Sequence, residues 1–159
     1  MRKKFVFTIA VLLCVGITST FTGCKKEEEE KVQGCTDVNA NNFDPNAEEN
    51  NGSCTYPTIN VSPTNTAGDL SGFGGTASRT ISFESTTQTI DWDMTIKATS
   101  GSFQLVVKDA DGTAVIDKTL TAGSGPQDDA GISASGTPGT WTLSVFLTNF
   151  NGTGDYSLQ

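Results

Sequence analysis

The chain contains no histidine, and this absence excludes several kinds of chemistry. Among its 159 residues there is no His, so neither a Ser-His-Asp nor a Cys-His relay can form, and no zinc can be held by imidazole. Basic residues are also few: ten Lys plus Arg stand against eighteen Asp plus Glu, giving a net charge of -8. Because proteins bind nucleic acid by placing cations on its phosphates, we expect no nucleic-acid partner.

Long apolar runs are missing except at the N-terminus. Arg2, Lys3 and Lys4 precede the apolar run 5–17. This run is too short to cross a bilayer comfortably, which takes about 20 residues. The pattern predicts a secretory signal peptide, with a short transmembrane anchor as the alternative.

The residues that follow carry a more specific motif. Phe21-Thr22-Gly23-Cys24 resembles the lipobox of bacterial lipoproteins, with Phe21 in place of the usual Leu. The resemblance implies that residues 1–23 are removed as the signal peptide. It also implies that the Cys24 thiol is acylated, for example with palmitate, so that the chain is anchored by lipid in the outer membrane. Cys14 leaves with the signal peptide, and Cys35 and Cys54 remain to pair in an oxidising compartment.

Residues 24–33 are dominated by charge. The run from Lys25 to Lys31 contains four consecutive Glu and no apolar residue, so it is expected to be a solvated, disordered tether. An acidic cluster directly after an acylated Cys is similar to the surface-export signal of lipoproteins in Bacteroidota-type bacteria. That similarity implies exposure on the cell surface, and a plain tether is the alternative.

Residues 34–56 form a candidate module of their own. They resemble a short repeat of secreted and cell-surface Bacteroidota proteins, Gly-Cys-Thr-Asp-Pro-x-Ala-x-Asn-Tyr-Asp-Pro-x-Ala-x-x-Asp-Asp-Gly-Ser-Cys. Val38, Phe43 and Asn50-Asn51 depart from that form. From the residues alone, a Cys35–Cys54 bridge encloses a loop whose closure is worth about 3 kcal/mol, in a segment too poor in apolar groups to fold without it. The positions in register with the repeat are Cys35, Thr36, Asp37, Ala40, Asn42, Asp44, Pro45, Ala47, Gly52, Ser53 and Cys54.

The same module offers oxygen ligands for a hard cation. Asp37, Asn39 and Asn41 stand at spacing 1-3-5 and Glu48 at position 12, which is the pattern of an EF-hand loop and predicts calcium as the cofactor. Pro45 in mid-loop and the lack of flanking helical patterns oppose this interpretation. The alternative is a purely structural disulfide-closed loop rich in turn residues.

Residues 57–159 alternate between apolar and polar side chains. The alternation predicts strands near 59–61, 80–83, 90–97, 103–108, 114–120, 131–133, 141–148 and 156–158. Asp109-Ala110-Asp111-Gly112 predicts a tight hairpin turn between two of them. One-sided alternation without an amphipathic helix predicts an all-β domain, an antiparallel β-sandwich of jelly-roll type.

The C-terminal tail suggests a relative. Segments 139–145 and 151–158 resemble the end of bacterial pre-peptidase C-terminal domains, which are small calcium-associated β-sandwiches attached to secreted enzymes. The resemblance implies an accessory role beside an enzyme. Asp109 and Asp111 are a second, weaker pair of candidate calcium ligands, although a hairpin turn favours the same residues.

Several carboxylates could also serve chemistry or binding. Asp91 and Asp93 share one face of a predicted strand, where paired carboxylates could act in glycoside hydrolysis, but an exposed strand normally carries such residues. Asp128-Asp129 lies in a predicted loop spanning 123–131, which is either a binding loop or simply solvated.

The aromatic residues could likewise either bind a ligand at the surface or pack in the core. Trp92 and Trp141 could stack on sugars, but both are in phase with aliphatic neighbours, which favours burial. Phe146 and Phe150 are out of phase with that pattern and are expected to be exposed, as is Phe73 in a Gly-rich segment.

Together these features predict a non-enzymatic lipoprotein of the cell surface that acts as a binding or adhesion module for glycan or protein. The alternative is a structural accessory subunit of an outer-membrane or secreted-enzyme assembly. A hydrolase built on Asp pairs is the third hypothesis.

Overall fold

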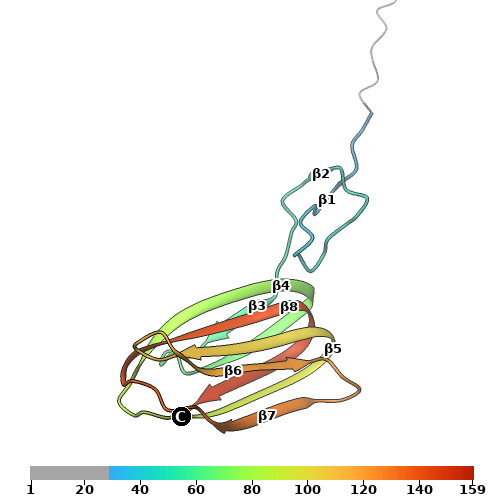
Figure 1. The fold of residues 1–159 in the computed structure, drawn as a ribbon. Coiled ribbons are helices and arrows are strands. Elements are labelled where there is room, and N and C mark those ends of the chain that lie inside the picture. The colour runs from blue at the N-terminus through green and yellow to red at the C-terminus, as the bar shows by residue number, and fades with distance from the viewer. Residues whose placement is uncertain (1–28) are drawn as a thin grey trace, which may run out of the picture. The chain divides into compact units, whose positions relative to one another are not determined.

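A computed structural model describes residues 29–159 (Figure 1). The predicted signal peptide, the lipobox residue Cys24 and residues 24–28 of the tether lie outside the described residues. Lys31–Gln159 form one compact unit. Within the described range every regular element is a strand, and no helix there could cross a membrane. The strands are β1 (Gln33–Gly34), β2 (Glu49–Asn50), β3 (Thr58–Val61), β4 (Ala67–Ser85), β5 (Asp91–Lys108), β6 (Ala114–Thr121), β7 (Gln127–Ile132) and β8 (Gly139–Leu158).

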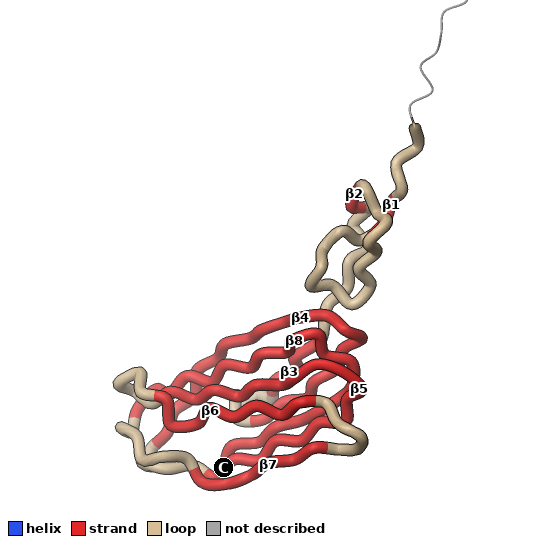
Figure 2. The backbone as a smooth tube through the Cα atoms, turned by 45° about the vertical axis from the view of Figure 1, so that its right-hand side comes forward, coloured by secondary structure: helices blue, strands red, loops and turns tan. Residues whose placement is uncertain are grey.

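Strands β3 to β8 form an antiparallel β-sandwich, as the alternation predicts. The hydrogen-bonded order is β3-β4-β8-β5-β6, with β7 also paired to β5. The long strands β4, β5 and β8 bend in the middle, so that each contributes to both layers (Figure 2). Layer 1 contains β3, β7, 67–73 of β4, 151–158 of β8 and 91–98 of β5. Layer 2 contains β6, 77–85 of β4, 139–148 of β8 and 102–108 of β5.

The bends lie where the pairing shifts register. In β8, Leu147 pairs with Ala77 and Phe150 pairs with Gly75, so β8 has one residue more than β4 at this point. At the bend of β5, Gly101 has a φ of +82°, and a Cβ there would lie 2.3 Å from the carbonyl oxygen of Asn149. Only glycine allows the strands to approach so closely while turning.

These bends correct the predicted strand boundaries. The segments 90–97 and 103–108 are one strand, and so are 141–148 and 156–158. The predicted strand 80–83 is the end of the much longer β4. Gly, Ser, Thr and Asn separate these segments, and such residues usually predict turns. Here they form bulges that bend a strand without ending it.

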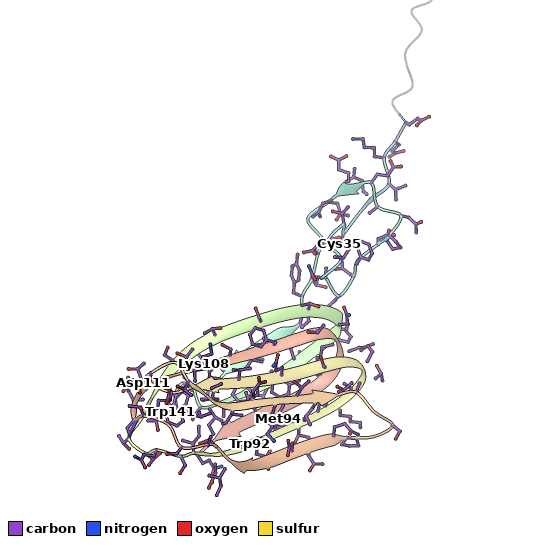
Figure 3. The ribbon with its side chains drawn as sticks, viewed as in Figure 1. Cys35, Trp92, Met94, Lys108, Asp111 and Trp141 are labelled. Carbon is purple, nitrogen blue, oxygen red and sulfur yellow. A yellow bond between two sulfur atoms is a disulfide. The ribbon has the colours of Figure 1, made fainter. Side chains whose placement is uncertain are left out.

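The core lies between the two layers. Trp92, Met94 and Trp141 point into it (Figure 3), so the two Trp residues serve the core and do not offer a surface for stacking. Trp141 packs 6.2 Å from the ring of Phe83, and its indole N–H donates to the carbonyl of Thr137. The other large, fully buried side chains are Tyr156, Phe103, Phe150, Ile96, Leu105, Leu143, Leu147, Val107 and Val145.

Phe150 contradicts the expectation that it is exposed, because it is fully buried. The extra residue in β8 shifts the alternation by one, so that Leu147 and Phe150 both face inward although they are three residues apart. Strict alternation from Leu147 would have placed Phe150 outside.

Polar contacts close the two open sides of the sandwich. On one side, a guanidinium N–H of Arg79 in β4 donates to the Ile59 carbonyl of β3 at 2.9 Å. On the other side, Lys118 of β6 lies 3.6 Å from a carboxylate oxygen of Asp129 in β7. The predicted loop 123–131 is therefore partly strand, and Asp129 has a partner across the layers.

The hairpin between β5 and β6 forms where it is predicted, but its turn is longer than two residues. The connection runs from Asp109 to Thr113, and Gly112 is the residue in it with a positive φ, +81°. Pairing of β5 with β6 shifts register at Val107 and Lys108. This places the turn among the longer hairpin loops built with a bulge.

The module 34–56 is closed by the predicted Cys35–Cys54 disulfide. Its regular structure is a two-residue parallel pairing of β1 with β2, and its buried apolar residues are Cys35 and Ala40. Asx turns shape the rest: the Asp44 carboxylate accepts from the backbone N–H of Asn46, and the Asn50 side chain accepts from that of Gly52. So small a core explains why the covalent link is needed.

Candidate functional site

A shallow pocket of about 460 Å³ lies where the disulfide module meets the outer face of layer 2. The exposed aromatic side chains that line it are Tyr56, 48% exposed, and Phe146, 38% exposed. We call this site the aromatic pocket. Its lining residues are Asp37, Asn39 and Tyr56 from the module, Thr76, Ala77 and Ser78 from β4, and Phe146, Leu147 and Thr148 from β8.

The strand alternation of β8 places Phe146 in this pocket. Val145 and Leu147 point into the core, so Phe146 between them points outward. Its cross-strand partners are Ser78 of β4 and Gln104 of β5. A large aromatic ring therefore lies open to solvent among small polar neighbours on a central strand, as expected above for this residue.

The disulfide brings together two of the pocket residues that the module contributes, Asp37 and Tyr56. Asp37 follows Cys35 by two residues and Tyr56 follows Cys54 by two, so the bridge sets these side chains close to each other. The Tyr56 hydroxyl donates to a carboxylate oxygen of Asp37 at 2.6 Å. The other carboxylate oxygen accepts from the backbone N–H of Asn39 at 2.9 Å.

These hydrogen bonds also set the protonation states. The Tyr56 hydroxyl lowers the pKa of Asp37, helped by the backbone N–H of Asn39. The Asp37 carboxylate in turn raises the pKa of Tyr56. At neutral pH the pocket therefore contains an ionised carboxylate beside a neutral phenol.

Asn41 attaches the module to the sandwich. Its side-chain oxygen accepts from the backbone N–H groups of Phe73, at 3.1 Å, and Gly75, at 3.2 Å, at the bulge of β4. The Asn39 carbonyl accepts from the backbone N–H of Thr76 at 2.8 Å. A Cβ on Gly75 would lie 2.8 Å from that same carbonyl oxygen. The bulge thus gives the module exposed N–H donors, and glycine allows the close approach.

The structure does not bring the four predicted calcium ligands of the module together, although Asp37 and Asn39 are neighbours. Asp37 bonds Tyr56 and Asn39, and the Asn41 oxygen is used by β4. Glu48 is exposed, and its backbone N–H donates to the Val32 carbonyl. Within residues 29–159 no group of three or more Asp, Glu, His or Cys side chains is arranged to hold a metal. Calcium binding remains a prediction from the sequence.

The second candidate pair, Asp109 and Asp111, organises its own turn. Asp109 accepts from the backbone N–H groups of Asp111, Thr113 and Thr137. The Asp111 carboxylate accepts from the Thr137 hydroxyl at 2.6 Å. Both side chains therefore have a structural role that accounts for their presence.

Asp91 and Asp93 lie on the exposed face of β5 in layer 1, as the alternation predicts. They line a separate shallow pocket of about 350 Å³, together with Ile132 of β7. Asp155 on the neighbouring strand β8 has a raised pKa, caused first by burial and then by the charges of Asp93 and Asp69. These carboxylates form an acidic face, and among the described residues no three of them are arranged to hold a metal ion.

Among the site residues that the sequence analysis missed, Tyr56 is the aromatic one. It lies at the end of the predicted module and far from Phe146 in sequence. A usable signal was its spacing, because Asp37 and Tyr56 each follow a bridged cysteine by two residues.

Comparisons with known proteins find distant likenesses. No protein-family model matches the chain, and no curated protein matches it. TmCBM61 in complex with β-1,4-galactotriose is similar at a TM-score of 0.42 and 9% identity, over 65% of this chain and 68% of that one. A CBM4 structure is similar at a TM-score of 0.41 and 11% identity, over 65% and 78%. The arabinose-bound α-L-arabinofuranosidase MgGH51 is similar at a TM-score of 0.37 and 10% identity, over 65% of this chain and 21% of that one. TmCBM61 and CBM4 are carbohydrate-binding modules with a β-sandwich fold, at identities too low to assign a ligand to this chain.

Proposed function

We propose that this protein is a non-enzymatic glycan-binding module whose binding surface is the aromatic pocket. The observation that carries the proposal is the pairing of two exposed rings, Tyr56 and Phe146, in one open pocket with hydrogen-bonding groups between them. A sugar ring has an apolar face that packs on an aromatic ring, and hydroxyl groups around its rim that need polar partners.

The polar lining suits those hydroxyl groups. Asp37 offers carboxylate oxygens, and Ser78 and Thr148 offer hydroxyls that both donate and accept. The pocket is shallow, which fits a chain segment lying across the surface better than a ligand enclosed on all sides. Exposed apolar side chains that gather in one place and are rimmed by polar residues are a feature of interaction sites.

We further propose that the module is displayed as a lipoprotein, anchored through acylated Cys24 and exposed on the outer membrane for binding or adhesion. The signal-peptide pattern, the lipobox and the acidic tether support this proposal. Labelled palmitate should enter the wild-type protein and not the Cys24→Ser variant. Protease added to intact cells should remove the domain, and full protection would contradict surface exposure.

The binding proposal is tested with the full chain on an array of oligosaccharides, followed by calorimetry on the best glycan. Phe146→Ala and Tyr56→Ala should each weaken binding by about fivefold or more, since stacking on one ring is worth on the order of 1 kcal/mol or more. Phe73→Ala is the matched control, because Phe73 is 77% exposed and lies outside the pocket lining.

Two outcomes would contradict the proposal. One is an array without any bound glycan. The other is equal loss of affinity from Phe73→Ala and Phe146→Ala. Co-purification of a stoichiometric protein partner that Phe146→Ala releases would instead favour an accessory subunit of an envelope or secreted-enzyme assembly.

A further inference from the structure

We propose that the aromatic pocket selects uncharged saccharides over those carrying uronic acid or sulfate groups, and that Asp37 is the residue that sets this selectivity. The inference rests on the glycan-binding function proposed above and names the class of glycan. It follows from where the charges near the pocket lie and from which hydrogen-bonding groups the pocket presents.

The pocket presents a negative charge at one of its two rings. Asp37 lines the pocket, and its carboxylate lies 2.6 Å from the Tyr56 hydroxyl oxygen. Because Tyr56 uses its proton to bond Asp37, the outer side of its oxygen is left as an acceptor. This part of the site therefore offers acceptors, which pair with the hydroxyl donors of a neutral sugar. A carboxylate or sulfate brings acceptors alone, and beside Asp37 it would meet a like charge.

The aromatic pocket has no Lys or Arg in its lining that could offset this charge. Arg79 donates to the Ile59 carbonyl, and Lys118 pairs with Asp129. Lys108 pairs with Thr142 across the strands, four residues from Phe146 along β8, or about 13 Å at the rise of a strand.

The size of the effect follows from Coulomb's law. Two like charges about 4 Å apart in water repel by roughly 1 kcal/mol, which is about a fivefold change in affinity. At a surface of lower effective dielectric the factor is larger, and at physiological salt the screening length is about 8 Å. A ligand charge in contact with Asp37 is therefore penalised, whereas a charge at the far end of the ligand is not.

The test compares glycans that differ only in charge. The full chain is titrated with matched pairs: methyl-esterified and de-esterified oligogalacturonate, and laminarin and sulfated laminarin. These are measured for the wild type, Asp37→Asn and Asp128→Asn. In Asp37→Asn, the amide oxygen can still accept from the Asn39 backbone N–H, and the amide N–H can donate to the Tyr56 hydroxyl oxygen, so both contacts can remain while the charge is removed. Asp128→Asn removes the same charge on the exposed face of β7, outside the pocket, and serves as the control.

We expect the wild type to bind the neutral member of a pair at least about fivefold more tightly. The ratio of the affinities for the neutral and the charged glycan should fall toward one in Asp37→Asn and stay unchanged in Asp128→Asn. In the wild type this ratio should decrease as salt rises from about 20 to about 500 mM. Equal affinity for both members, or a preference that Asp37→Asn leaves intact, would overturn the inference while glycan binding stands. Failure of every glycan, including those of the array, would overturn the inference and the proposed function together.

Discussion

Asp109 is a carboxylate that the fold buries, with only 7% of its surface exposed. One of its oxygens accepts from the backbone N–H groups of Asp111 and Thr113, and the other accepts from that of Thr137. These bonds join the β5–β6 turn to the segment that leads into β8. The bond from Thr137 is the first cause of the lowered pKa of Asp109.

This lowered pKa predicts a pH-dependent contribution to stability. The folded state favours ionised Asp109, so its contribution is complete above the ordinary value of 3.8 and is lost as pH falls through the lower, folded value. Asp109→Asn replaces one acceptor with a donor that faces an N–H group, and should unfold at a lower temperature at pH 7. The difference from the wild type should shrink below pH 3.8. A constant difference from pH 7 to pH 2 would contradict this.

At the scale of the strands, alternation predicts the core except where a bulge shifts it. Trp141 and Leu143 are buried and Phe146 is exposed, as alternation along β8 predicts. Phe150 lies beyond the bulge and faces inward. A bulge depends on which residues of two strands pair, and a single strand's pattern does not contain that information. For the same reason, the sequence does not predict that β5 and β8 each continue through a bend as one strand.

Layer 1 also contains a destabilising arrangement of charges. Asp155 of β8 lies directly across from Asp69 of β4, and Asp93 is on the neighbouring strand β5. Like charges that face each other across strands destabilise a sheet. Burial and these two charges raise the pKa of Asp155, so the folded state disfavours its ionised form.

We therefore expect Asp155→Asn to stabilise the protein at pH 7 by a few tenths of a kcal/mol, the usual size of such pair effects. The gain should vanish below the ordinary carboxyl value of 3.8, where the wild-type carboxyl is protonated in both states. Thermal unfolding of the two proteins at pH 7 and pH 3 measures this. A variant less stable than the wild type at pH 7 would show that the carboxylate has a favourable partner.

At the scale of the whole molecule, the sandwich and the disulfide module belong to one compact unit and line one pocket, but their stability has different sources. The sandwich has a continuous apolar core, whereas the module has the Cys35–Cys54 bridge and two buried apolar residues. The sequence was sufficient to predict the bridge, the sandwich and the exposure of Phe146. It did not predict that Tyr56 and Phe146 line one pocket, because their proximity depends on Asn41 bonding the bulge of β4.

This division predicts how the protein responds to loss of the bridge. In Cys35→Ser/Cys54→Ser, the module loses about 3 kcal/mol of loop-closure stabilisation and should unfold. Both Trp residues lie in the sandwich core, so Trp fluorescence should report a melting temperature within a few degrees of the wild type. Glycan binding should be lost, because Tyr56 and Asp37 are no longer held together. Retained affinity would show that Phe146 and the sandwich suffice.

The same bridge determines how the chain carries mechanical force. A pull on the N-terminal end of the described chain reaches Cys35 and crosses to Cys54 through the disulfide. The 18 residues between the two cysteines are bypassed, and about 60 Å of extended chain stays out of reach of the load. The force therefore passes from Cys54 through Tyr56 to strand β3 of the sandwich. A polymer bound at Tyr56 and Phe146 would load a covalent bond and a folded sheet, and within the bypassed loop the hydrogen bonds of Asn39 and Asn41 to β4 would share that load.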